Sequence, residues 1–366
     1  MTELVQEVGL QNSWGKVIET AYHHAVVPQF YKACKSLSPL VPKEHLLFLQ
    51  QAYQQIAQEN MRLSAELISL SKELDKRHIQ YIALKGPTLA QELYNDITLR
   101  QICDLDLLID EVNISDVAKL LIESGFESRL PLSLLENKGF LALDNDFTFL
   151  HHTKKTMVEL HWKLFPKRHN MPLDFKTLYR ASDQILIQNK TITVLSQEHN
   201  LLYLCLHGSK HIFEELKWLC DIDRLIRINP AIDLEKVYEN AKELDVTEPL
   251  MLGLLMSQCL YSTPLPDSIV DRAKPTTEFL LRTALDFFVQ DFNTLNEPVK
   301  KRERFLFLNS LNQNKQNRII ALIKSAFTPS SVDYIHYNLP SRYNFLYPLL
   351  RPPRLFYKYL LKKILA

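Results

Sequence analysis

The stretch ICDLDLLID, residues 102–110, is the part of the sequence that most restricts the fold. Its apolar residues predict a buried strand, yet Asp104 and Asp106 lie two positions apart within it. Successive side chains on a strand point to opposite faces, so these two carboxylates would share one face. Because two like charges buried together without a partner cost free energy, this face must also hold a compensating charge.

The residues before the acidic strand predict a strand, a glycine turn and a helix. HIQYIAL (78–84) has strand character, and residues 88–94 return to helical spacing. Pro87 suits the first turn of a helix, where a missing N–H group does no harm. The chain has only seven glycines, so the one at position 86 indicates a backbone requirement.

This glycine turn is a candidate phosphate site. Free N–H groups at 84–88 and the helix N-terminus attract anions, while Lys85 adds a point charge and Thr88 a hydroxyl. Arg100, shortly before the acidic strand, would neutralise a phosphate or hold an aspartate. The alternatives are that Gly86 serves only a tight turn, that the lysine lies on the surface, and that the arginine forms an ordinary salt bridge.

Two carboxylates on one strand face become favourable when a divalent cation lies between them. Mg²⁺ prefers hard oxygen ligands, and a two-metal site needs a third carboxylate to hold the catalytic ion. Glu159 is the lone acid of the strand-like stretch 156–162. An adjacent strand would bring this acid near Asp104 and Asp106.

The rest of the chain divides by periodicity. Residues from about 44 to 77 contain neither Gly nor Pro and repeat apolar residues at helical steps. FTFLHH and TMVELHW, separated by a Lys-Lys turn, predict a hairpin, and QILIQNKTITVL fits a second. Helical patterns prevail after about residue 196. We therefore expect a helical N-terminal segment (1–77), an α/β core (78–195), a helical C-terminal domain (196–328) and a Pro-, Tyr- and Arg-rich basic tail (329–366).

Composition and charge exclude several classes of protein. Hydrophobic residues make up 46% of the chain and charged residues 23%, as in ordinary soluble globular proteins. A net charge of +1 argues against a nucleic-acid footprint over the whole surface. The five scattered cysteines include no CxxC pair, so we expect no disulfide framework, no thiolate zinc site and a cytoplasmic location. No apolar run is long enough to span a bilayer.

The order of these motifs resembles the DNA polymerase beta-like nucleotidyltransferase superfamily. In that superfamily a strand, a glycine loop and a helix precede Asp-x-Asp on the next strand and a third acid on a later one. LKGPTLAQELYNDITLRQICDLDLLI (84–109) is more similar still to bacterial nucleotidyltransferase-like proteins that are often left uncharacterised. The resemblance covers roughly residues 79–226. Its later motifs are a Glu-x-His, here Glu159 and His161, and a helix with His207, Trp218 and Asp221.

The resemblance implies an α+β fold, with a mixed nucleotidyltransferase sheet, flanking helices and a helical C-terminal domain. It implies that Asp104 and Asp106 bridge two Mg²⁺ ions, which Mn²⁺ can replace, and that Glu159 completes the catalytic ion. Asp104 or Glu159 would accept the proton of the attacking hydroxyl. The nucleotide-binding residues would be Lys85, Gly86, Thr88 and Arg100.

Four further residues are candidates for a supporting shell: His161, His207, Lys210 and Asp221. His161 would share the face of Glu159, where it orients this carboxylate, lines the pocket or is a structural histidine. His207 and His211 have a spacing that can bind zinc, but without an HExxH motif such a pair is usually structural. Asp221 would cap a helix, pair with a histidine or contact a substrate.

We expect a Mg²⁺-dependent enzyme that moves a nucleoside monophosphate from an NTP to a hydroxyl of a small molecule or protein. ATP is the default donor because it is abundant. No basic patch covers the α/β core, which argues against long nucleic acids as partners.

Two alternative functions remain open. One is a catalytically silent nucleotide-binding scaffold, and the other is a membrane-associated assembly protein that works through the basic tail. From Tyr334 onward the chain has six Lys or Arg and no acid, with apolar residues at helical spacing. This pattern fits peripheral membrane contact, and it also fits a helix packed on its own protein.

Overall fold

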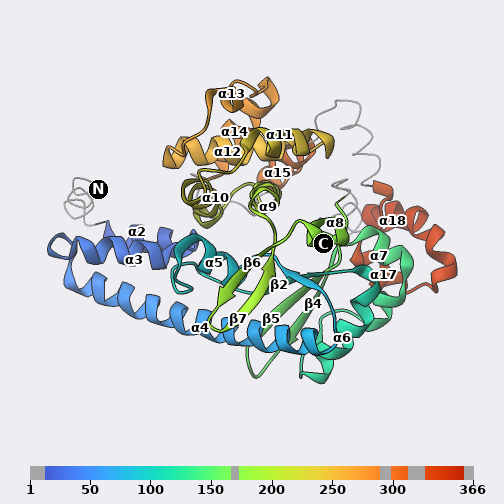
Figure 1. The fold of residues 1–366 in the computed structure, drawn as a ribbon. Helices are drawn as coiled ribbons and strands as arrows, with labels where there is room; N and C mark the ends of the chain where they lie inside the picture. The colour runs from blue at the N-terminus through green and yellow to red at the C-terminus, as the bar shows by residue number, and fades with distance from the viewer. Residues whose placement is uncertain (1–12, 166–172, 289–297, 312–325, 358–366) are drawn as a thin grey trace.

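A mixed β-sheet forms the centre of the molecule (Figure 1). A computed structural model describes residues 13–165, 173–288, 298–311 and 326–357. The strands are β1 (Tyr81–Ala83), β2 (Leu105–Ile109), β3 (Glu127–Ser128), β4 (Asp146–His151), β5 (Thr156–His161), β6 (Asp183–Ile187) and β7 (Lys190–Val194). Their order across the sheet is β3-β4-β5-β2-β1-β7-β6. β2 pairs with β5, and β1 with β7, in parallel, whereas the other neighbours are antiparallel.

Helices cover both faces of this sheet. On one side lie α4 (Lys43–Lys76), α6 (Ile114–Glu123) and α7 (Lys138–Leu143), and α2 (Trp14–His23) and α3 (Val27–Ser36) pack against α4. α5 (Gly86–Tyr94) and α8 (Phe175–Arg180) contribute to the core on the other side. The helical C-terminal region contains α9 (Gln197–Lys210), α10 (Leu216–Ile228), α11 (Leu234–Glu243), α12 (Thr247–Tyr261), α13 (Asp267–Val270), α14 (Pro275–Phe288) and α15 (Pro298–Ser310). The tail forms α17 (Ser331–Tyr337) and α18 (Tyr347–Phe356). The short 3₁₀ segments are η1 (Ser38–Leu40), η2 (Glu111–Asn113), η3 (Leu132–Glu136) and η6 (Ser341–Leu346).

Each face of the sheet has its own hydrophobic core. Leu105, Leu107 and Ile109 of β2 pack with a stripe of leucines from α4, namely Leu63, Leu67, Leu70 and Leu74. Leu108 belongs to the opposite core, which α9, α10 and α12 complete. Asp106 has the same parity as Leu108, so it points toward these C-terminal helices. The strand is apolar toward α4 and carries its acid on the other face.

A third core joins the N-terminal helices to both α4 and α10. Trp14, Val27 and Tyr31 of α2 and α3 are buried with residues of α4. Leu216 and Cys220 of α10 pack against the same cluster. Figure 1 shows α2 and α3 lying alongside the first half of α4. The N-terminal segment therefore touches the C-terminal helices directly.

The structure confirms the predicted long helix as α4 and the two predicted hairpins as β4–β5 and β6–β7. The acidic strand is shorter than the pattern 102–109 indicates, because β2 begins at Leu105. β1 ends at Ala83, opposite Leu107, and the chain then turns away into α5. Asp104 consequently precedes the strand, although it remains next to Asp106. The predicted domain boundaries stay predictions.

The described part of the tail packs on the protein itself. Asp333 is fully buried and accepts hydrogen bonds from Arg351 and Arg354, with Arg354 Nε at 2.6 Å. Asn344 donates to Asn137 at the start of α7 at 2.8 Å. This arrangement matches the interpretation of the tail as a packed helix, and residues 358–366 of the predicted amphipathic stretch lie outside the described residues. None of the described helices is long and apolar enough to cross a membrane.

Two helical glycines should respond in opposite ways to alanine. A Cβ on Gly208 would overlap the ring of buried Phe213, whereas a Cβ on Gly15 would meet nothing within 4 Å. We expect Gly208→Ala to lower the free energy of unfolding by about 1–3 kcal/mol. Gly15→Ala should raise it by about 0.5–1 kcal/mol, because alanine is the better helix former. Denaturant unfolding of both variants checks this, and a destabilised Gly15→Ala would contradict the packing of α2.

Candidate active site

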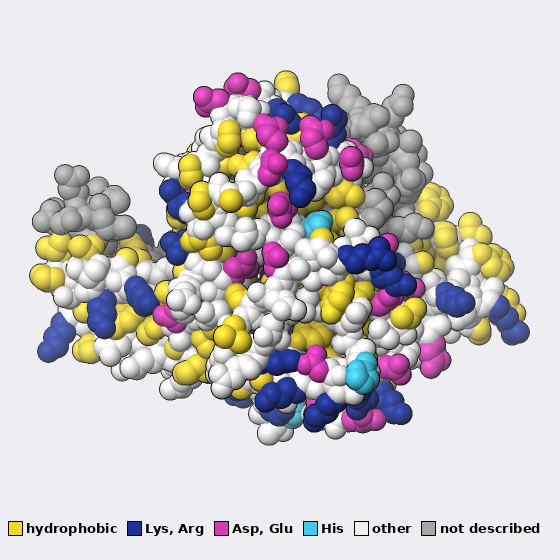
Figure 2. Space-filling model, in the orientation of Figure 1, with side chains coloured by type: hydrophobic (Ala, Val, Ile, Leu, Met, Phe, Trp, Pro, Cys, Tyr) yellow, Lys and Arg dark blue, Asp and Glu magenta, His cyan; other side chains and the backbone are white. Residues whose placement is uncertain are grey.

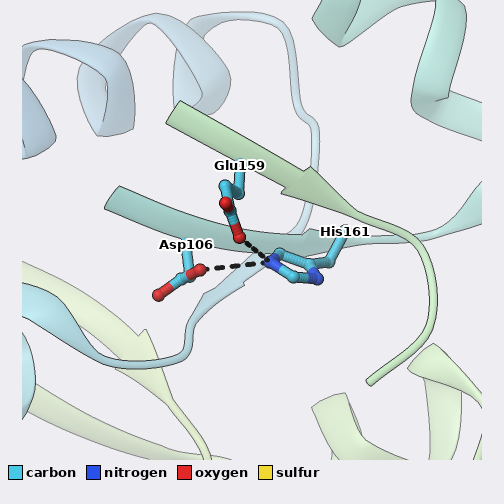
Figure 3. Close-up of side chains that lie close together, drawn as sticks. All are labelled: Asp106, Glu159 and His161. Carbon is cyan, nitrogen blue, oxygen red and sulfur yellow. Dashed lines mark hydrogen bonds and ion pairs between the residues drawn. The ribbon is translucent and has the colours of Figure 1, made fainter. Parts of the chain in front are cut away.

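The parallel pairing of β2 with β5 assembles the acidic cluster. In this register Asp106 lies opposite Glu159, and Leu108 lies opposite His161. The side chains of Asp106, Glu159 and His161 converge on one face of the sheet, as Figure 3 shows. The predicted approach of Glu159 to the strand acids is therefore confirmed.

His161 lies between the two carboxylates. Its Nε2 is 3.1 Å from Asp106 Oδ1 and 3.5 Å from Glu159 Oε2, while the side-chain amide of Asn145 lies 3.3 Å from Nδ1. Burial alone would lower the pKa of His161, but its hydrogen bonds to Asp106 and Glu159 raise this pKa to about 9. His161 thus contacts both carboxylates, Asp106 more closely than Glu159, and it also lines the pocket described below.

Lys85 supplies the second positive charge beside Asp106. Its Nζ is 3.2 Å from Asp106 Oδ2 and 5.8 Å from the ring centroid of Tyr203. Burial would raise the pKa of Asp106, but Lys85 and His161 outweigh it and hold this pKa well below the usual range. Lys85 keeps a pKa above its ordinary value for the same reason, despite its own burial. The buried carboxylate is thus paired on both sides.

Asp104 has a different environment from Asp106. Burial raises its pKa to about 6, and the neighbouring charge of Asp106 acts in the same direction. Glu159 raises this pKa further, whereas Lys85 and Lys217 oppose the rise. The two acids that the sequence treats as equivalent therefore differ in how well their charges are compensated.

The turn after β1 brings Lys85 to the site. Gly86 has φ +66°, and a Cβ at this position would lie 3.3 Å from the Asp104 carbonyl oxygen. Both facts require glycine, because an L side chain is strained there and lacks room. Thr88 is buried, and its hydroxyl donates to the Lys85 carbonyl at 2.7 Å. Thr88 therefore stabilises the turn and does not line the pocket described next.

A pocket of about 440 Å³ opens between the sheet and the C-terminal helices. Asp104, Asp146 and Glu159 line its acidic side, next to Lys85 and Gly86. The opposite wall comes from α9, α10 and the connection between them, with His207, Lys210, His211, Lys217 and Trp218. Acidic and basic groups thus face each other across one cavity.

Three flat rings form part of the basic wall. His207 and His211 have ring centroids 4.9 Å apart, and Trp218 lies 5.6 and 5.1 Å from them. Burial lowers the pKa of His207, and it lowers the pKa of His211 to about 4, with nearby lysines acting in the same direction. Among the described residues, His207 and His211 belong to no cluster of three metal ligands. The geometry therefore favours the structural interpretation of this pair over zinc binding.

Arg100 and Asp221 form a buried ion pair. Arg100 Nε and one terminal amino group donate to the Asp221 carboxylate at 2.9–3.1 Å. Both side chains are at most 5% exposed. This pair favours the salt-bridge alternative for Arg100, and it assigns Asp221 a partner other than a helix end or a histidine. It also ties α10 to the segment that precedes β2.

Comparison with known proteins matches residues 11–262 of this chain to the family described as "Uncharacterised nucleotidyltransferase". The chain belongs to this family. Among solved structures it is similar to an antigenic nucleotidyltransferase-like protein from Paracoccidioides brasiliensis, at 19% identity and a TM-score of 0.33. That alignment covers 52% of this chain and 92% of the other. No curated protein matches.

Membership confirms the predicted family and fold class, and it supports a function in nucleotidyl transfer. Within the nucleotidyltransferase family, divalent metals are general, and the donors present here fit such an ion. Ligand atoms of Asp106, Glu159 and His161 lie within 4.8 Å of one another. Asp106 and Glu159 would hold such an ion through their carboxylate oxygens, the ligands that Mg²⁺ prefers.

Several residues that line the pocket are not predicted from the sequence. Asn145 and Asp146 belong to the pocket, and Asp146 pairs with His161 in the β4–β5 register. Asp146 lies one residue before the predicted strand FTFLHH, so the hairpin pattern stops just short of it. Trp218 belongs to a motif of the resemblance, although its hydrophobicity would place it in the core, and Lys217 carries no such signal. They reach the pocket only through the packing of α10 on the sheet.

Replacing the two acids one at a time should change stability in opposite directions. The raised pKa of Asp104 means that its charge destabilises the fold above about pH 6, so Asp104→Asn should raise the free energy of unfolding at pH 7 by about 2 kcal/mol. The lowered pKa of Asp106 means that its charge stabilises the fold at every pH above the unfolded value. Asp106→Asn should therefore lower stability by about 3 kcal/mol, because it leaves Lys85 buried and unpaired.

Denaturant unfolding in the presence of a metal chelator measures both effects. The gain from Asp104→Asn should shrink at pH 5, where wild-type Asp104 is partly protonated. If the two acids were equivalent and only repelled each other, either substitution would instead raise the free energy of unfolding. A rise in stability for both would contradict the pairing of Asp106 with Lys85 and His161.

Proposed function

We propose that the protein is a Mg²⁺-dependent nucleotidyltransferase that moves a nucleoside monophosphate, AMP by default, from an NTP to a hydroxyl group and releases pyrophosphate. The observation that carries this proposal is the β2–β5 register, which aligns Asp106 with Glu159 on one face of the sheet. Asp104 and the Gly86 turn border the same pocket. Carboxylates beside a cationic glycine turn are the arrangement that a metal-bound triphosphate requires.

The acidic residues would hold the metal and the attacking group. Asp104, Asp106 and Glu159 offer hard oxygen ligands, and His161 holds the two strand carboxylates in orientation. Bound Mg²⁺ supplies charge neutralisation at the phosphates and lowers the pKa of the acceptor hydroxyl. Asp104 or Glu159 accepts the proton that this hydroxyl releases.

The glycine turn would hold the departing pyrophosphate. Lys85 provides a point charge, and the missing side chain of Gly86 lets the turn pack closely on the Asp104 backbone at the edge of the pocket. Pro87 contributes no N–H group, so the turn offers fewer backbone donors than a glycine loop without proline would. The guanidinium of Arg100 is already engaged in the bidentate pair with Asp221. Arg100 therefore acts by tying α10 to the segment before β2. The remaining phosphate charge then requires cations from the opposite wall.

The acceptor would be a small molecule or a protein hydroxyl. A pocket of about 440 Å³ lies within the range typical of small-molecule sites. Figure 2 shows acidic and basic side chains mixed over the face that it draws, with no single basic stripe of the kind that long nucleic acids need.

Nucleotide transfer can be tested with labelled donors. We expect the wild-type protein with Mg²⁺ to transfer label from one of the four NTPs to an acceptor in a host extract. Two variants, the double variant Asp104→Asn/Asp106→Asn and the single variant Glu159→Gln, should each lose more than about 100-fold in transfer rate. Glu111→Gln, an exposed acid just past the other end of β2, is the matched control and should retain the rate. Full turnover in the double variant would sink the mechanism and favour a silent nucleotide-binding scaffold.

Lys85→Ala should change the affinities for metal and nucleotide in opposite directions. Lys85 competes with any cation for Asp106, so its removal should tighten binding of Mg²⁺ alone by several-fold. Loss of its charge should weaken binding of Mg²⁺–ATP about tenfold. Titration calorimetry measures both, with Lys119→Ala on the exposed side of α6 as the control. An unchanged nucleotide affinity would remove Lys85 from the phosphate site.

A further inference from the structure

Lys217 stands at the point where α10 enters the pocket. Its side chain is 8% exposed and lines the cavity opposite the carboxylates. Its charge is close enough to Asp104 to oppose the rise of that pKa, which burial causes first. An ion pair with Glu215 at 2.9 Å leaves two of its three ammonium protons available. Lys217 therefore adds a cation on the α10 side of the pocket, apart from Lys85 on the glycine turn, and it is placed to meet the outer phosphate oxygens of a donor.

The first turn of α10 depends on His24 from the N-terminal segment. The Leu216 N–H donates to His24 Nδ1 at 3.3 Å, and the Lys217 N–H donates to the His24 carbonyl at 3.2 Å. The residue at the helix start, Glu215, makes no side-chain capping bond. The first four amides of a helix lack partners within the helix, and His24 supplies acceptors for two of them. These amides are then engaged, and the side chain of Lys217 is the group left to contact a ligand.

His24 is itself held rigidly. It is 7% exposed, and its ring stacks on Phe288 of α14 at 4.7 Å and 25°. Burial lowers its pKa, with His23 acting in the same direction and the Glu214 backbone and Glu215 opposing the shift. The Leu216 N–H points at Nδ1, which accepts in the neutral ring. Ala25, with φ +55°, follows directly and ends the turn between α2 and α3 that presents the histidine.

We infer that His24 is a positioning residue for the donor nucleotide: it fixes the first turn of α10 so that the Lys217 ammonium reaches the outer phosphates of a Mg²⁺–NTP. This inference rests on the proposed function and extends it to a segment far from the acidic cluster in sequence. Nucleotide affinity then depends on α2 and α3, although His24 itself does not line the pocket.

The test measures binding of a non-hydrolysable ATP analogue with Mg²⁺ to the full chain. His24→Leu removes the ring acceptor, His24→Asn keeps an oxygen acceptor, and Lys217→Ala removes the charge. The double variant His24→Leu/Lys217→Ala reports whether the two residues act as a unit. Ile18→Ala, a cavity in the same N-terminal core, is the control for lost stability without lost capping.

We expect His24→Leu to raise the Kd about three- to tenfold and Lys217→Ala about tenfold. The double variant should bind no more weakly than Lys217→Ala, because His24 acts only through that side chain. His24→Asn should bind almost as the wild type does, and Ile18→Ala should lose melting temperature while keeping its affinity.

Three results would overturn the inference. Additive losses in the double variant, an asparagine variant as weak as the leucine variant, or an equal loss in Ile18→Ala would each reduce His24 to a general structural role. If the wild type binds the analogue, these outcomes leave the proposed function intact. If the wild type binds none of the four Mg²⁺–NTPs, the proposed function fails and takes the role of His24 with it.

Discussion

The charge of Asp106 is the constraint on which the arrangement of the site depends. This carboxylate is 3% exposed on a central strand, where an unpaired charge would be too costly to keep. Lys85 compensates it from the turn after β1, and His161 compensates it from the end of β5. Both partners reach it only when β1 and β5 flank β2 in the observed order. The topology of the sheet and the chemistry of the site are therefore satisfied by the same arrangement.

Helix α10 connects the separate parts of the chain around this charge. Asp221 pairs with Arg100 just before the acidic strand, and Arg224 donates to the Leu93 carbonyl at the end of α5 at 3.0 and 3.2 Å. His24 accepts from the first amides of the same helix. Polar contacts of this kind specify a geometry more than they add stability, because each one also costs desolvation. Their combined effect is to hold the basic wall of the pocket at a fixed place opposite the acids.

Periodicity predicts the elements whose burial repeats regularly, which are α4 and the two hairpins, and motif order predicts the association of Glu159 with the strand acids. Periodicity fails to predict the structure where the local backbone departs from the regular pattern. Asp104 looks like a strand residue, but its neighbour strand has already turned away at Lys85. Thr88 looks like a phosphate ligand, but its hydroxyl is bound within the turn. In both cases a single backbone turn at Gly86 decides the outcome, and hydrophobic spacing carries no information about it.

The sequence by itself determined the fold class and the family, and it predicted which three acids border the site. These depend on residue types at short, regular spacings. The tertiary structure alone decided which charges are compensated. The partner of Arg100 lies 121 positions away at Asp221, and the acceptor for the first amides of α10 lies 192 positions away at His24. Contacts over such separations follow from how whole helices pack on the sheet, and no local pattern of residues encodes them.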